Sequence, residues 1–166
     1  MKNLVILFSL LLSVKGYSQN DMVSYSIENN KKVVSQMDID SLENVLIGMI
    51  NSFRVSKGLI VLTKDESLSI YADKWSSNML VKNKIYHSDI QSNSIVAENV
   101  YISKSFGVFP MTKEYVSEVT NRIYNSWLTS EKHKKNMLTE GINKIGVSIV
   151  LLPNGMVDES STMVVN

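Results

Sequence analysis

Cysteine is absent from this chain of 166 residues, and only two histidines are present. Without cysteine the protein can form no disulfide bond, no thiolate nucleophile and no Cys-ligated zinc site. Its stability must therefore come from packing and hydrogen bonds. An excess of charge of one sign is also lacking, because 17 basic residues face 16 acidic ones. This balance favours neither nucleic acid nor an anionic membrane as a partner.

One apolar run is present, and it lies near the N-terminus. Lys2 precedes this run, which covers residues 4–14 and has the pattern of a secretory signal peptide. It is shorter than the roughly 20 apolar residues that a membrane-spanning helix needs. Small residues near its end predict cleavage after Ser18, so that residues 1–18 are removed. We therefore expect a secreted or periplasmic protein that has no transmembrane segment in its mature form.

The remaining residues have the length of one domain with a sizeable core. Residues 19–37 are rich in Ser, Asn and Lys and lack a clear period, which predicts a flexible lead-in. Residues 38–166 are then the predicted domain. The chain contains no internal repeat and no low-complexity tract.

Apolar residues recur at three- and four-residue steps, which is the pattern of amphipathic helices. The first predicted helix begins at Asp40, where Asp40 and Glu43 resemble a capping box, and it ends before Gly58. Trp75 and Trp127 fall on the apolar stripes of later helices, which predicts core packing for both. Three further segments are predicted to be helical: residues 65–82, residues 113–128 and a short turn at residues 132–138.

The pattern changes toward the C-terminus. Residues 145–152 are rich in β-branched side chains and predict a strand, and Asn154-Gly155 after them favours a hairpin. Residues 163–165 predict one more short strand. Because the helices come first and the strands last, the sequence indicates an α+β fold and not alternating βαβ units.

Three polar residues are candidates for chemistry. His87 and His133 lie in polar or helix-edge contexts, and a single histidine is more often structural than a ligand or catalyst. Glu98 lies in the largely apolar segment 96–101, where a buried carboxylate needs a partner. Either Glu98 and Asn99 hold a loop through hydrogen bonds to the backbone, or Glu98 has a metal-binding or acid–base role.

Six sequence blocks, in this order, resemble the CAP superfamily of cysteine-rich secretory, antigen 5 and pathogenesis-related 1 proteins. The resemblance covers nearly all of the predicted domain and implies a three-layer α-β-α sandwich with a cleft. The blocks are Asn51-Ser52-Phe53-Arg54, Tyr86-His87-Ser88-Asp89, Ala97-Glu98-Asn99-Val100, Trp127-Leu128-Thr129-Ser130, the run from His133 to Leu138, and Ile145-Gly146-Val147.

Many members of that superfamily hold a divalent cation with two histidines and two acidic residues. The resemblance implies His87, Glu98 and His133 as metal ligands, whereas the fourth position is occupied by Ser130. Two imidazoles, one carboxylate and a water still suit zinc or another divalent cation. Ser130 itself is expected to cap the short helix that follows it. The residues expected around the cleft are His87, Glu98, Asn99, Ser130, His133 and Asn136.

Three classes of function remain open at this point. The first is a non-enzymatic binding module whose cleft takes a metal and a small apolar or peptide ligand, or a protein partner. The second is a hydrolase in which a zinc-bound water is the nucleophile, with Glu98 as base and His133 as a further catalytic candidate. The third is a scaffold in which the same polar residues only brace loops.

Overall fold

A computed structural model describes residues 36–89, 95–105, 113–153 and 157–166. The predicted signal peptide, nearly all of the predicted lead-in and the predicted turn at Asn154-Gly155 lie outside the described residues. None of the helices in the described ranges is long and apolar enough to cross a membrane.

Along the described chain, β1 and β2 lie between helices, and β3 and β4 follow the last helix. A four-stranded sheet has the order β1-β3-β4-β2, in which β1 pairs parallel with β3 and the other pairs are antiparallel. The elements are α1 (Gln36–Ser56), β1 (Thr63–Lys64), α2 (Glu66–Lys82), β2 (Ala97–Ser105), α3 (Lys113–Thr129), α4 (Glu131–Met137), β3 (Lys144–Pro153) and β4 (Val157–Val165).

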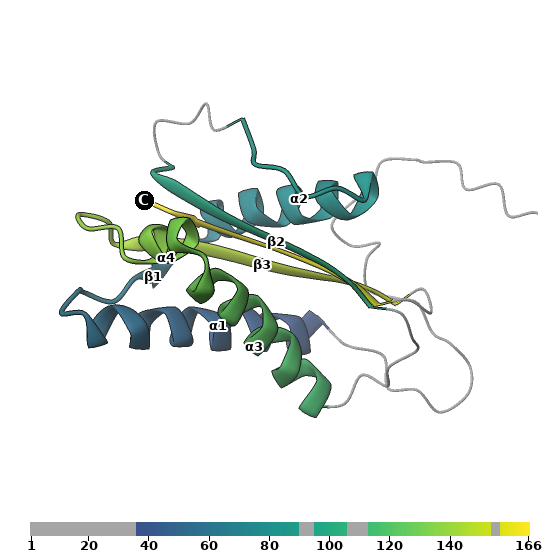
Figure 1. Cartoon of the computed structure of the whole chain (residues 1–166), viewed down its shortest axis with the longest axis horizontal. Coiled ribbons are helices and arrows are strands. Elements are labelled where there is room, and N and C mark those ends of the chain that lie inside the picture. Colours follow the sequence, from purple (N-terminus) through teal and green to yellow (C-terminus); the bar gives the residue numbers. More distant parts are fainter. Residues whose placement is uncertain (1–35, 90–94, 106–112, 154–156) are drawn as a thin grey trace, which may run out of the picture.

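The elements form three layers, with α2 on one face of the sheet and α1, α3 and α4 on the other (Figure 1). Successive residues of a strand point to opposite faces, so each buried strand serves both layers. On β3, Ile145 and Val147 join the main core with α1 and α3, while Gly146 lies against α2. The α+β, α-β-α sandwich fold predicted from the sequence is confirmed.

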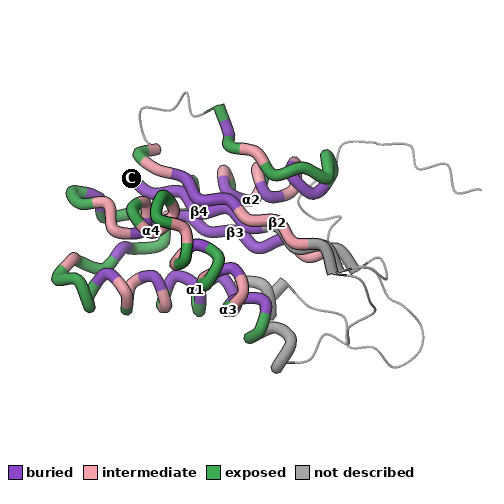
Figure 2. The backbone as a smooth tube through the Cα atoms, in the orientation of Figure 1, coloured by how far each residue is buried: buried purple, intermediate pink, exposed green. Residues whose placement is uncertain are grey.

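The central strands are buried along most of their described length, whereas the helices expose one side (Figure 2). β4 is an interior strand of the sheet, and Met163, Val164 and Val165 are fully buried near its end. Trp127 is also fully buried and belongs to the main core, as predicted, and Trp75 is partly buried. The last residues of β4 therefore complete the core of the sandwich.

The predicted start of the first helix was wrong. α1 begins at Gln36, so Asp40 lies inside the helix and does not cap it. The Glu43 side chain does not reach back to a helix end. It is nearly buried, and it accepts hydrogen bonds from Lys64 Nζ at 3.2 Å and from the Ile149 backbone N–H at 3.3 Å. The local pattern resembled a cap because it could not include these distant partners.

Strand content was underestimated in the predictions. β4 runs from Val157, whereas the sequence predicts only residues 163–165, and β2 was not assigned as a strand. β4 begins with several polar residues, but it is paired on both sides, by β2 and by β3. Hydrogen bonding to two neighbours therefore overrides its weak intrinsic preference. In β2, Glu98 and Asn99 are both buried, so the strand shows no alternation of apolar and polar residues.

Candidate functional site

The candidate site lies at the edge strand β2, which has β4 on one side only. Two of its backbone carbonyl groups nevertheless accept hydrogen bonds from side chains. Asn136 Nδ2 of α4 donates to the Glu98 carbonyl at 2.9 Å, and Trp127 Nε1 of α3 donates to the Val100 carbonyl at 3.2 Å. Covering a sheet edge in this way prevents pairing with another chain. It also fixes α4 beside β2.

The Glu98 carboxylate is buried, with 1% of its side chain exposed, and both of its oxygens are hydrogen bonded. Its Oε1 accepts from His87 Nδ1 at 2.8 Å and from the Ser88 backbone N–H at 3.0 Å, and its Oε2 accepts from Ser88 Oγ at 2.6 Å. Three donors offset the cost of burying this charge. Glu98 thus clamps the segment after α2 onto β2.

The two histidines approach each other although they come from distant parts of the chain. The ring centroids of His87 and His133 are 6.4 Å apart, with an angle of 59° between the ring planes. The His87 side chain is 58% exposed, and its Nδ1 is bonded to Glu98, which leaves Nε2 for another partner. His133 Nδ1 is buried and has no hydrogen-bond partner in the described structure.

Helix α4 presents His133 because three polar side chains hold its first turn. Ser130 is the N-cap, and its side chain accepts from the His133 backbone N–H at 3.5 Å, which confirms the predicted cap. Asn99 Nδ2 donates to the His133 carbonyl at 3.0 Å, and Asn136 Nδ2 donates to Asn99 Oδ1 at 2.9 Å. The six residues expected around the cleft therefore lie together, linked through β2 and α4.

Fewer side chains near β2 are available as metal ligands than the sequence suggests. In the part of the chain that the structure describes, no three His, Cys, Asp or Glu side chains form a group that could hold a metal ion. Both oxygens of Glu98 already accept hydrogen bonds from His87 and Ser88. Of the described side chains there, only the two imidazole rings therefore remain as direct metal ligands. Imidazole ligands suit zinc, copper and nickel. A carboxylate often holds a metal-ligating histidine in place through a hydrogen bond to its second ring nitrogen, as Glu98 does for His87. The metal set of His87, Glu98 and His133 stays a prediction.

A serine nucleophile finds no support in this geometry. Ser88 Oγ donates to the Glu98 carboxylate, and Glu98 in turn accepts from His87, so the carboxylate lies between the serine and the histidine. In a catalytic triad the histidine lies between the other two and takes the serine proton. Ser130 is used as a helix cap. Neither serine is therefore activated.

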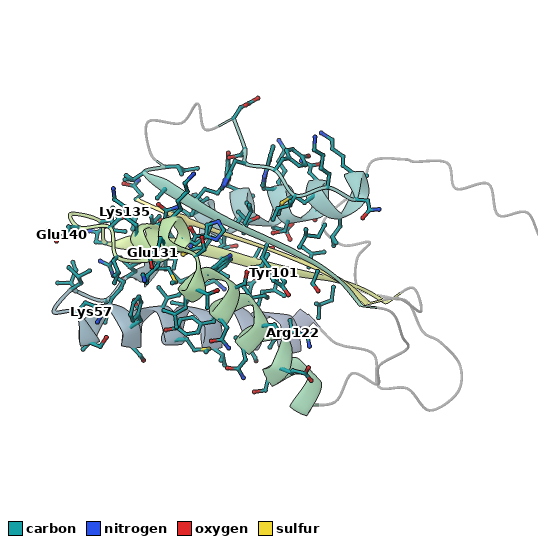
Figure 3. All side chains as sticks on the ribbon, in the orientation of Figure 1. Lys57, Tyr101, Arg122, Glu131, Lys135 and Glu140 are labelled. Atoms are coloured by element: carbon teal, nitrogen blue, oxygen red, sulfur yellow. The ribbon has the colours of Figure 1, made fainter. Side chains whose placement is uncertain are left out.

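A shallow hollow of about 520 Å³ lies on the outer side of α4. Figure 3 shows two of its residues, Glu131 and Lys135, on this helix. Glu131 Oε1 is 2.6 Å from Lys134 Nζ on the exposed surface, so it does not supply the carboxylate that is absent at position 130. The lining consists of Glu131, Lys132, Lys134, Lys135 and Leu138 and does not include either histidine.

Two residues of the site were not predicted. Ser88 is nearly buried and gives Glu98 two of its three donors. Trp75, predicted only as a core residue, donates from its indole Nε1 to the Tyr86 carbonyl at 2.9 Å. The position of Ser88 beside His87 was the one available signal, whereas nothing near Trp75 in the sequence indicates this bond.

Lowering the pH from about 7.5 to about 5 should destabilise the wild-type protein more than a His133→Gln variant. Burial, and then the charge of His87, lower the pKa of His133. The unfolded chain takes up this proton near its ordinary pKa of about 6.5, and the folded chain does so only at lower pH. The contribution of neutral His133 is therefore present above about pH 6.5 and lost as the pH falls. Thermal melts of both proteins measure this, and equal losses would contradict it.

Comparisons with known proteins agree with this fold. A sequence model of the CAP family, described as the cysteine-rich secretory protein family, matches residues 47–165. An uncharacterised protein of Bacillus subtilis (strain 168), YkwD, is 27% identical over 127 residues, which are 74% of this chain. The chain spans 48% of the length of that curated relative.

Solved structures with the same fold include proteins from the outer surface and the exterior of bacteria. An outer surface protein of Borrelia burgdorferi has a TM-score of 0.57 at 17% identity, covering 81% of this chain and 96% of its own. An extracellular SCP-domain protein of Bacillus anthracis has a TM-score of 0.54 at 15% identity, covering 81% of this chain and 45% of its own. With its sequence matched over residues 47–165, this cysteine-free chain belongs to the CAP family of cysteine-rich secretory proteins.

Proposed function

We propose that this protein is a secreted, non-enzymatic binding module whose metal site is the imidazole pair of His87 and His133. The observation that carries the proposal is the approach of these two rings to 6.4 Å, with Glu98 bonded to Nδ1 of His87. A metal-ligating histidine usually donates its second ring N–H to a carboxylate or carbonyl group. His87 Nε2, which is left without a bond to Glu98, would therefore be the atom that holds a metal or ligand.

The metal proposed is zinc or another divalent transition metal. Imidazole nitrogen suits zinc, copper and nickel, whereas calcium and magnesium prefer oxygen ligands. When bound, such an ion would supply a Lewis acid beside the exposed His87 side chain, with water or a ligand atom completing its coordination. Another CAP-fold structure, that of NaASP2, was determined with Zn²⁺, at a TM-score of 0.50 and 14% identity to this chain.

A binding role is favoured over hydrolysis because the proposed base is not accessible. Glu98 has 1% of its side chain exposed and already accepts three hydrogen bonds. It therefore cannot take a proton from water without losing at least one of these bonds. A general base must reach the proton that it abstracts within hydrogen-bond distance. His87, by contrast, is 58% exposed and open to a small apolar or peptide ligand or to a protein partner.

Export is part of the proposal. The predicted signal peptide at residues 1–18 supports it, and so do the outer-surface and extracellular locations in the names of the structural neighbours. The position of cleavage after Ser18 can be checked by sequencing the N-terminus of the exported protein.

Zinc titration by calorimetry tests the metal site. Wild-type protein should bind one zinc ion per chain. A His87→Ala/His133→Ala variant should lose this binding entirely, because both imidazole ligands are removed. Magnesium, which prefers oxygen ligands, is the matched control ion and should not bind either protein. A thermal melt of the variant shows whether it is folded.

Two results would overturn the metal site. Wild-type protein that takes up no zinc, combined with a lower melting temperature of the double variant, would make the two histidines and Glu98 a structural brace. Zinc binding that survives in the double variant would place the metal elsewhere.

A further inference from the structure

Trp75 lies on α2 and contacts the chain directly before His87. Its indole Nε1 donates to the Tyr86 carbonyl at 2.9 Å. Its ring also meets the Tyr86 ring edge-on, with 4.9 Å between the ring centroids and 66° between the planes. A partly buried carbonyl is thus satisfied by a side chain where no helix or strand is available to do so.

The segment at residues 84–89 contains no helix or strand, so side chains must hold it in place. The backbone N–H of Lys84 bonds to the Met79 carbonyl at 3.1 Å, which ends α2. Beyond that point, the segment is anchored by Trp75 at Tyr86 and by Glu98 at His87 and Ser88. His87 is therefore fixed from both sides along the chain, by Trp75 at the preceding residue and by Glu98 at the following one.

Side-chain packing alone does not hold His87 in place, so the hydrogen bonds from Trp75 and to Glu98 are needed. The His87 side chain is 58% exposed, so few neighbours restrict its ring, and the single bond to Glu98 sets only one ring nitrogen. The direction in which Nε2 points therefore depends on where the main chain of residues 86–88 lies. This main chain is held by hydrogen bonds to Trp75 and Glu98, which come from different elements.

We propose that Trp75 is a positioning residue for His87, acting through the Tyr86 carbonyl to hold the His87 ring beside that of His133. This inference rests on the proposed function, in which the two imidazoles share a metal. A residue behind a metal ligand typically changes metal affinity by about 10- to 100-fold when it is lost. Because Trp75 acts one residue away from the ligand, we expect an effect near the lower limit.

The substitution Trp75→Phe isolates the hydrogen bond. Phenylalanine keeps an aromatic ring against Tyr86 but has no N–H to donate. Asn51→Ala is the matched control, because Asn51 of α1 also donates from its side chain to a backbone carbonyl, that of Leu62 at 2.9 Å, away from β2, α4 and the segment at residues 84–89. Asn51 also accepts from the Leu62 backbone N–H at 2.8 Å, so the control should lower the melting temperature at least as much as Trp75→Phe does.

Two measurements on full-length protein test the role of Trp75. Zinc calorimetry should show a Kd about 10-fold higher for Trp75→Phe and little change for Asn51→Ala. Hydrogen exchange of the Ser88 amide, which donates to Glu98, should be about 10-fold faster in metal-free Trp75→Phe and unchanged in the control.

The outcomes separate the two proposals. Wild-type protein that binds no zinc would remove the proposed function, while the Ser88 exchange rate would still report whether Trp75 holds the segment. Unchanged zinc affinity and unchanged Ser88 exchange in Trp75→Phe would overturn the positioning role. Equal losses of affinity in both variants would also overturn it, because the effect would then be general destabilisation.

Discussion

Replacement of Gly146 by alanine should destabilise the folded protein by about 3 kcal/mol or more. A Cβ atom at this position of β3 would overlap the backbone of Leu68 and Ser69 in the first turn of α2. Backbone atoms cannot rotate away as a side chain can, so α2 would have to move off the sheet. Urea or thermal unfolding of the variant measures the loss.

Gly48→Ala is the matched control for this effect. Gly48 lies on the exposed side of α1, and a Cβ atom there would meet nothing within 4 Å. Alanine in a helix interior is more favourable than glycine by roughly 0.5–1 kcal/mol, so this variant should be slightly more stable than wild type. A Gly146→Ala protein as stable as wild type would show that α2 does not pack this closely on β3.

The second large effect is expected from Arg54→Met. Arg54 is 1% exposed, and its guanidinium group donates to three backbone carbonyls: Ile60 at 3.0 Å, Met137 at 2.9 Å and Thr139 at 2.9 Å. Methionine fills much of the same space but donates nothing. Each hydrogen bond to a charged group contributes roughly 1.5–3 kcal/mol, but methionine also avoids the cost of burying the charged guanidinium, so we expect a net loss of about 3 kcal/mol in unfolding free energy.

Arg54 also connects the end of α1 to the end of α4, the helix that carries His133. Residues from both regions, Lys57 and Glu140, lie at the same end of the molecule in Figure 3. Arg54→Met should therefore also weaken the zinc binding that we propose, because the position of α4 is less well defined. Calorimetry on the variant, at a temperature where it is folded, measures this second effect.

Lys57→Met is the control for the loss of a positive charge at this end. Lys57 is exposed, and its Nζ lies 5.7 Å from the centroid of the Phe53 ring. Surface substitutions of this kind usually change stability by less than about 0.5 kcal/mol. If Arg54→Met and Lys57→Met had equally small effects, the three carbonyl bonds of Arg54 would not be needed to hold the ends of α1 and α4 together.

Most predictions that depend on neighbouring residues were confirmed, with the exception of the helix start at Asp40. Helix α2 runs from Glu66 to Lys82, almost the predicted range of residues 65–82, because its signals are local. Asp65 caps it by accepting from the Leu68 backbone N–H at 3.0 Å, three residues away. The Ser130 cap spans the same distance to His133. Such bonds form within one turn, so the local sequence is sufficient to predict them.

Predictions about the site needed contacts between distant segments. The order of blocks resembling the CAP family placed His87, Glu98 and His133 in one region, and the structure brings them together at β2. The sequence did not indicate that both carboxylate oxygens of Glu98 would accept hydrogen bonds from His87 and Ser88. A carboxylate in an apolar segment shows that a partner is needed, but it does not show which one.

By itself, the sequence determined the family, the α+β class and the main helices. The tertiary structure alone decided that β2 forms an edge, that Trp75 and Glu98 hold His87 from either side, and that Gly146 permits α2 to lie on β3. The physical reason is the range of the interactions. Helix periodicity and caps act within a few residues, whereas strand pairing and buried hydrogen bonds depend on which distant segments the folded chain brings into contact.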